Sequence, residues 1–136
     1  MTTPATPPVG TINWFDLTVA DADTVRDFYA DVVGWTVEPL SMGDYADYVM
    51  KSPESGAGVA GVCHARGANA GLPAVWLMYV QVADVDASAA RCVERGGKVL
   101  APPRSAGPQG RYCVIQDPAG AAVALFGPPA PAGAGQ

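Results

Sequence analysis

Residues 14–35 read WFDLTVADADTVRDFYADVVGW, and the pattern of this segment, which returns later in the chain, indicates the fold. The segment VADAD at residues 19–23 recurs as VADVD at residues 82–86, which is 63 positions further on. The same offset carries Gly34 onto Gly97. Two halves that share a pattern at a fixed offset predict a duplicated architecture.

The order of elements is the same in both halves. A strand gives way to a helix at a pair of aspartates, whose side chains can accept the first backbone N–H groups. An apolar stripe follows at helical spacing, and a glycine that can adopt the left-handed conformation ends it. The stripes are Val25, Phe28, Tyr29 and Val32, then Val85, Ala89, Cys92 and Val93. After an opening strand at 11–20 and its helix, short β-rich segments are expected at 35–38, 45–51, 58–64, 98–100, 111–116 and 121–126. The unit βαβββ occurs twice, which predicts an α+β fold.

The length and composition predict one domain. The chain has 136 residues, of which 49% are apolar, and this is enough to bury a core. Both ends consist of Pro, Ala, Gly and Thr, which favour flexible tails at residues 1–8 and 128–136. We therefore expect a single domain at 9–127, with module one at 9–66, a linker at 67–73 and module two at 74–127.

Charge and cysteine usage exclude several classes of function. The net charge is −5 and no stretch clusters Lys or Arg, so a nucleic-acid partner is not expected. The first residues lack a basic start and an apolar run, so we expect no signal peptide, no membrane span and a cytoplasmic protein. Cys63, Cys92 and Cys113 lack metal-binding spacing and are interpreted as buried thiols. A nucleophilic cysteine would need an activating base nearby.

Three segments resemble the signature stretches of the vicinal oxygen chelate superfamily, which includes glyoxalases, bleomycin resistance proteins and extradiol dioxygenases. They are WFDLTVADADTVRDFYADVVGW at 14–35, YVQVADVDASAARCVERGGKVLAPP at 79–103 and GRYCVIQDPAGAAVALF at 110–126. The resemblance implies two tandem βαβββ modules forming a curved mixed sheet cup, with ligands inside the cup and helices outside. Family members of this size are commonly homodimers, so we expect a homodimer.

The sequence departs from the family at the positions that hold the metal ion. The resemblance places those positions at Trp14, Leu77 and Ala124. An indole, an isobutyl group and a methyl group offer no N, O or S donor of the kind that cations require. We therefore expect no metal at this place and no other cofactor.

Strand alternation predicts what lines the cup instead. If Leu17 and Val19 pack under the first helix, the period of two sends Trp14 and Asp16 to the opposite face. The same reasoning gives a ligand-binding set that is mostly aromatic and aliphatic: Trp14, Asp16, Tyr45, Tyr48, Met50, Leu77, Tyr79, Ala124 and Phe126. Within it, Tyr48 and Met50 are expected to face inward and Tyr45 to lie at the rim. Each of these residues could instead be an ordinary core or surface residue, and Trp14 could simply fill the core.

Two classes of function follow. The first is a metal-independent binding protein that sequesters an apolar or aromatic metabolite or antibiotic. The alternative is a metal-free isomerase, cyclase or lyase acting on a natural product, with Asp16, Tyr48 or His64 as the general acid or base. His64 is the only histidine of the sequence, and its place at the end of an apolar strand favours a structural role. A regulatory or purely structural protein on the same fold is a third possibility.

Overall fold

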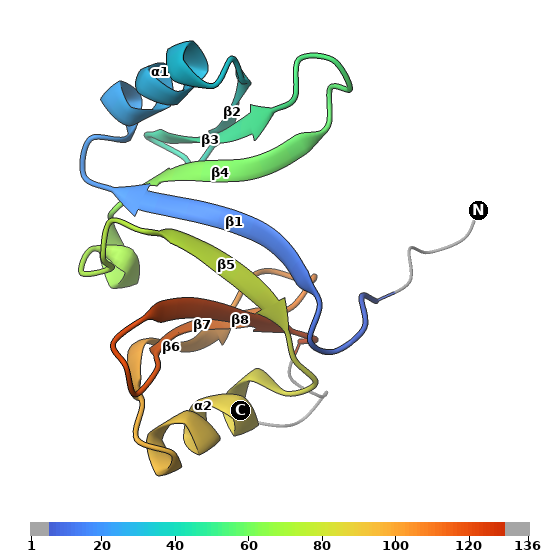
Figure 1. Cartoon of the computed structure of the whole chain (residues 1–136), viewed down its shortest axis with the longest axis vertical. Coiled ribbons are helices and arrows are strands. Elements are labelled where there is room, and N and C mark those ends of the chain that lie inside the picture. Colours follow the sequence, from blue (N-terminus) through green and yellow to red (C-terminus); the bar gives the residue numbers. More distant parts are fainter. Residues whose placement is uncertain (1–5, 130–136) are drawn as a thin grey trace. The chain divides into compact units, whose positions relative to one another are not determined.

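A computed structural model describes residues 6–129. Its elements are β1 (Ile12–Val19), α1 (Ala22–Val32), β2 (Thr36–Ser41), β3 (Ala46–Lys51), β4 (Gly58–His64), the short 3₁₀ helix η1 (Gly67–Asn69), β5 (Trp76–Gln81), α2 (Val85–Glu94), β6 (Lys98–Ser105), β7 (Arg111–Gln116) and β8 (Ala122–Gly127). This order confirms the predicted α+β class and the repeated βαβββ unit (Figure 1).

The described chain forms two compact units. The first unit comprises residues 14–77, and the second comprises residues 6–13 together with 78–129. In the first unit the strand order is β2-β3-β4-β1, where β1 runs parallel to β4 and the other neighbours are antiparallel. In the second unit the order is β5-β8-β7-β6, with β5 parallel to β8. Each unit is therefore a mixed four-stranded sheet with one helix.

Aspartate caps start both helices, as the sequence predicts. The side chain of Asp21 accepts a hydrogen bond from the Thr24 N–H, and that of Asp84 accepts one from the Ala87 N–H. The prediction that the second aspartate of each pair also caps is wrong. Asp23 and Asp86 lie in the first helical turn, where their side chains bind groups on neighbouring elements.

The helices bury a narrower stripe than the spacing predicts. In α1, Val25 and Tyr29 pack against a core formed by Ala22, Tyr48, Met50 and Val62. Phe28 and Val32, which the sequence assigned to the same stripe, are 55% and 62% exposed. In α2, Val85 and Ala89 are buried against Cys113 and Leu125, whereas Val93 is exposed.

β6 is longer than the predicted 98–100 segment. It continues through Pro102 and Pro103 to Ser105 and pairs with β7 across two irregularities in the register. Proline cannot donate a hydrogen bond to a sheet, so it is tolerated here because β6 is an edge strand. The strand therefore continues through the proline pair, with an irregular register between Ala101 and Arg104.

The predicted tails fall mostly on residues 1–5 and 130–136, which lie outside the described residues. Between residues 6 and 129, no helix is both long and apolar enough to cross a membrane.

Candidate functional site

Trp14 and Asp16 lie on the face of the first unit that points away from α1. Val19 packs on the α1 side, so alternation along β1 turns residues 14 and 16 to the opposite side, as predicted. The Trp14 indole Nε1–H donates a hydrogen bond of 2.7 Å to Asp16 Oδ1. Both side chains are half-buried. The hydrogen bond orients the indole, so this aromatic surface is held in one position.

Two glycines of β4 lie beside the indole and its partner Asp16. A Cβ atom built on Gly61 would lie 2.2 Å from Asp16 Oδ1 and 3.5 Å from Trp14 Nε1. A Cβ atom built on Gly58 would lie 3.6 Å from Trp14 Cη2 and 2.9 Å from Val49 Cγ1. The ring therefore extends along the β4 backbone from Gly61 to Gly58. We call Trp14, Asp16, Gly58 and Gly61 the indole ledge.

Cys63 is an inert thiol beside this ledge. Burial raises its pKa far above the ordinary thiol value, and the carboxylates of Asp16 and Asp47 raise it further. A thiol that stays protonated is a poor nucleophile. Burial, together with Cys92 and Asp86, also raises the pKa of Cys113 to about 11. Cys113 is buried, as predicted, whereas Cys63 and Cys92 are only partly buried, so the prediction of buried thiols is correct for one cysteine of the three.

The predicted orientation of Tyr48 and Met50 is wrong. Both side chains lie in the core under α1, and Met50 is 0% exposed. The two residues do share a face of β3, as alternation requires, but pairing of Tyr48 with Val62 turns that face toward the helix. Tyr45 precedes β3, where its ring stacks under the Arg66 guanidinium at 4.1 Å and contacts the His64 ring edge-on.

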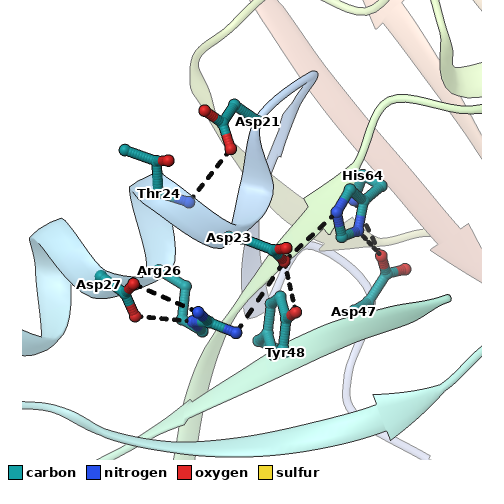
Figure 2. A network of polar contacts seen from close by, with 8 residues as sticks. All are labelled: Asp21, Asp23, Thr24, Arg26, Asp27, Asp47, Tyr48 and His64. Atoms are coloured by element: carbon teal, nitrogen blue, oxygen red, sulfur yellow. Dashed lines mark hydrogen bonds and ion pairs between the residues drawn. The ribbon is translucent and has the colours of Figure 1, made fainter.

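A polar network joins the first turn of α1 to β3 and the end of β4 (Figure 2). Tyr48 Oη donates a hydrogen bond of 2.5 Å to Asp23 Oδ1, and His64 Nε2 lies 3.5 Å from the same oxygen. On the other side of the ring, His64 Nδ1 lies 3.4 Å from Asp47 Oδ1, which also accepts a 2.8 Å hydrogen bond from the His64 backbone N–H. The Arg26 guanidinium lies 4.6 Å from the centre of the Tyr48 ring.

In the second unit, the aspartate equivalent to Asp23 is Asp86, and different side chains form hydrogen bonds with its carboxylate. The offset of 63 positions carries Asp23 onto Asp86 and His64 onto Gly127, whereas strand pairing places Cys113 where the first unit has Tyr48. Arg111 donates two hydrogen bonds to Asp86, of 2.9 and 3.0 Å. A single permanent cation thus replaces the tyrosine and histidine of the first unit. The shared position of the two aspartates indicates that the network primarily fastens α1 to its sheet.

Removing the Asp23 carboxylate is expected to lower the pKa of Tyr48. The hydrogen bond to Asp23 raises this pKa above its ordinary value, burial adds to the rise and Arg26 opposes it. A raised phenol pKa means that the fold favours the protonated form, so the stabilisation is present below the unfolded pKa and is lost as the pH rises through the folded one. Ultraviolet absorbance of the phenolate should show one tyrosine ionising earlier in Asp23→Ala than in wild type. The control Asp31→Ala, on the same helix, should leave the titration unchanged; identical curves for all three proteins would contradict the assignment.

The second unit also presents aromatic residues on the strand face away from its helix. Val80 and Cys113 pack toward α2, so their neighbours Tyr79 and Tyr112 face the other way, with ring centres 6.4 Å apart. Phe126 pairs with Tyr112, and its ring would lie 2.9 Å from a Cβ atom on Gly110. Tyr112 was missed from the sequence, although it alternates with the buried Cys113. Leu77 in the first unit and Ala124 in the second are fully covered side chains.

The family's metal positions do not fit a metal ion in this chain. The only polar side-chain atom of Trp14 donates a hydrogen bond to Asp16, and the side chains of Leu77 and Ala124 have no polar atom. Within the described range 6–129, no three His, Cys, Asp or Glu side chains converge as a ligand set. These three positions therefore offer no ligand set for metal-assisted chemistry.

Comparisons with known proteins agree with this fold. The family model described as Glyoxalase/Bleomycin resistance protein/Dioxygenase superfamily matches residues 11–125. The protein named "Putative glyoxylase CFP32" of Mycobacterium tuberculosis is 35% identical over 118 residues, which are 86% of this chain and 45% of that protein. "Anthracycline biosynthesis protein DnrV" of Streptomyces peucetius is 33% identical over 125 residues, covering 83% of this chain and 45% of that protein. The chain thus spans about half the length of the curated relatives it matches.

Solved structures show the same fold at low sequence identity. The methylmalonyl-CoA epimerase from Mycobacterium tuberculosis matches with a TM-score of 0.54 at 20% identity, covering 94% of this chain and 94% of that one. The Mn(II)-bound glyoxalase of Novosphingobium aromaticivorans matches with a TM-score of 0.53 at 22% identity, covering 88% and 39%. At these identities the likeness concerns the fold alone.

Proposed function

Because the chain belongs to the Glyoxalase/Bleomycin resistance protein/Dioxygenase superfamily, we propose that it binds a flat, apolar small molecule on the indole ledge without the help of a metal ion. The observation that carries this proposal is the Trp14 indole, which is fixed by Asp16 above two glycines. A fixed aromatic ring loses little conformational entropy when a ligand stacks on it. Sequestration of a metabolite or an antibiotic is the activity that this arrangement supports best.

Two interactions would hold the ligand, namely stacking on the Trp14 indole and a hydrogen bond to Asp16. An aromatic pair contributes about 0.5–1.5 kcal/mol beyond the burial of its surface. Asp16 adds a carboxylate beside the indole, and a carboxylate can accept a hydrogen bond from a hydroxyl group of a ligand. The ledge therefore suits a planar, hydroxylated aromatic molecule.

Two curated relatives motivate the choice of a test ligand. The proteins named DnrV and DauV, at 33% and 32% identity, are described as anthracycline biosynthesis proteins. An anthracycline combines a planar aromatic ring system with hydroxyl groups, which is the chemistry that the ledge would accept. We therefore take an anthracycline as the probe.

Titration of the protein with an anthracycline should quench tryptophan fluorescence and saturate. In Trp14→Leu the affinity should fall by about tenfold or more, which corresponds to about 1.4 kcal/mol. The matched control is Phe15→Leu, since Phe15 is the next residue of β1 and is also partly exposed, but it points to the other face. Equal losses in both variants, or no saturable quenching in the wild type, would contradict the proposal.

One observation favours a second candidate, a metal-free isomerase, cyclase or lyase. The His64 ring lies between the Asp47 and Asp23 carboxylates, and its side chain is 19% exposed. The His64 Nδ1 atom is buried without a hydrogen-bond partner among residues 6–129, and a histidine beside carboxylates can act as a general acid or base. Mass spectrometry and chromatography of the probe after incubation would detect an isomer or a cleaved product. If His64→Gln or Asp16→Asn abolishes turnover while the probe still binds, the protein is an enzyme and not only a binding protein.

A further inference from the structure

The His64 ring lies between two carboxylates that come from different elements (Figure 2). Its Nε2 atom lies 3.5 Å from Oδ1 of Asp23, in the first turn of α1. Its Nδ1 atom lies 3.4 Å from Oδ1 of Asp47 on β3. The Nδ1 atom is buried and has no hydrogen-bond partner among residues 6–129. We call Asp23, His64 and Asp47 the histidine bridge.

The number of N–H groups on the ring decides how many of the two carboxylates it can bind. A neutral imidazole carries one N–H group, so its other nitrogen presents a lone pair to a carboxylate oxygen, and two acceptors form no hydrogen bond. An imidazolium carries an N–H group on both nitrogens and can donate to Asp23 and Asp47 together. Hydrogen bonds between charged partners are also the stronger kind. Protonation of His64 therefore adds a link between α1 and the sheet.

The other polar groups around the ring do not provide a pH-dependent link of this kind. Arg26 lies 3.9 Å from Asp23, but both residues belong to α1, so their ion pair cannot hold the helix to a strand. The Tyr48 hydroxyl group donates to Asp23 from β3, and a phenol does not titrate in the range of histidine. Histidine is the one residue type of this neighbourhood that ordinarily changes its charge between pH 5 and 8. The remaining titratable or charged groups nearby are Asp27, Asp44, Tyr45, Cys63 and Arg66.

The second unit holds its helix with a permanent cation at the equivalent place. The offset of 63 positions carries His64 onto Gly127, and Gly127 pairs with Arg111 across β8 and β7. Arg111 donates hydrogen bonds of 2.9 and 3.0 Å to Asp86, in the first turn of α2. Arginine remains charged throughout the physiological pH range. The two units therefore attach their helices in the same way, but only the first unit uses a cation that titrates.

We propose that protonation of His64 strengthens the attachment of α1 to its sheet, so that the first helix responds to pH between about 5 and 8 and the second helix does not. The added stabilisation is present at the acid end of this range, where the imidazole is charged, and is lost as the pH rises. The histidine bridge is built on α1 and its sheet, whereas the indole ledge lies on the face away from α1. The proposal goes beyond ligand binding and does not depend on it.

Hydrogen–deuterium exchange of the backbone amides, followed by NMR at about pH 6 and about pH 8, tests this proposal on the full chain. After correction for the intrinsic exchange rates, the amides of α1 should be about twofold to fivefold better protected at the lower pH, as expected of a partly exposed ion pair. The amides of α2 should keep the same protection and serve as the internal reference. A response that is equal in α1 and α2, or absent from both, overturns the proposal.

Two variants remove the histidine bridge from opposite ends. His64→Gln replaces the ring with an uncharged amide and should abolish the pH dependence of α1 while α2 stays unchanged. Asp23→Asn should do the same, because the imidazolium then has no carboxylate on α1. The matched control is Asp86→Asn, at the equivalent position of α2. It should weaken the protection of α2 at both pH values and leave the pH response of α1 intact.

A His64→Gln protein whose α1 still responds to pH would overturn the proposal, because another group would then be responsible. If His64→Gln fails to fold, α2 loses its protection as well, and His64→Arg decides the question. The arginine supplies a permanent cation, as Arg111 does in the second unit. In His64→Arg the protection of α1 should be equal at both pH values, and a persisting difference would again overturn the proposal.

Discussion

Met50→Ala is expected to lower the free energy of unfolding by about 2–5 kcal/mol, the usual cost of removing a large side chain from a core. Met50 is fully buried in the cluster that α1 covers, where Ala22, Tyr48 and Val62 surround it. The truncation would leave a cavity that these neighbours can fill only in part. The sequence assigned Met50 to a ligand-binding wall, which would instead predict a loss of affinity.

Chemical denaturation of the wild type and of Met50→Ala measures the change in the free energy of unfolding. Met42→Ala is the matched control. Met42 is 46% exposed, so the same truncation there should change the stability by less than about 0.5 kcal/mol. Where Met50→Ala is still folded, its affinity for the anthracycline probe should equal that of the wild type. A normal stability combined with a large loss of affinity would mean that Met50 contacts the ligand.

Gly61→Ala is expected to damage the indole ledge itself. The new Cβ atom would lie 2.2 Å from Asp16 Oδ1, which is far closer than two such atoms can approach. The Asp16 carboxylate must move, which disturbs its hydrogen bond to Trp14. We expect a stability loss of about 1–3 kcal/mol, as for other overpacked sites. The affinity for the probe should fall at least about tenfold, because the indole is no longer held in place.

Gly71→Ala is the matched control, since nothing lies within 4 Å of a Cβ atom at that position. The double variant Gly61→Ala with Asp16→Ala removes the clashing carboxylate. It should regain most of the stability but not the affinity. If the double variant binds like the wild type, Asp16 has no part in orienting the indole and the ledge is not the binding surface.

The fold could be predicted because the sequence pattern of the βαβββ unit occurs in both halves of the chain. The repeat of VADAD as VADVD predicted the two βαβββ units, and the caps at Asp21 and Asp84 followed from residue type alone. The facing of Trp14 and Tyr79 could also be predicted, because Val19 and Val80 lie on strands directly before helices that cover them. At Trp14 and Tyr79, strand alternation in the sequence and packing against the helices therefore indicate the same face.

The errors concern features that depend on pairing across the chain. Alternation along β3 predicted that Tyr48 and Met50 share a face but not which face, since that is set by the register with β4. The spacing in α1 assigned Phe28 and Val32 to the buried stripe, but Ala22, Val25 and Tyr29 cover the sheet without them. The contact of His64 with Asp23 and Asp47 joins three elements, and nothing in the local sequence signals it.

The indole N–H signals in a heteronuclear NMR spectrum can show directly whether a ligand stacks on Trp14. The chain has three tryptophans, and Trp→Phe variants would assign their signals. Trp35 and Trp76 pack with Tyr29 under α1, whereas Trp14 lies on the other face and donates to Asp16. An anthracycline should shift the Trp14 indole signal and leave the other two in place. A ligand that binds without moving the Trp14 signal, or that moves the Trp76 signal instead, would contradict it.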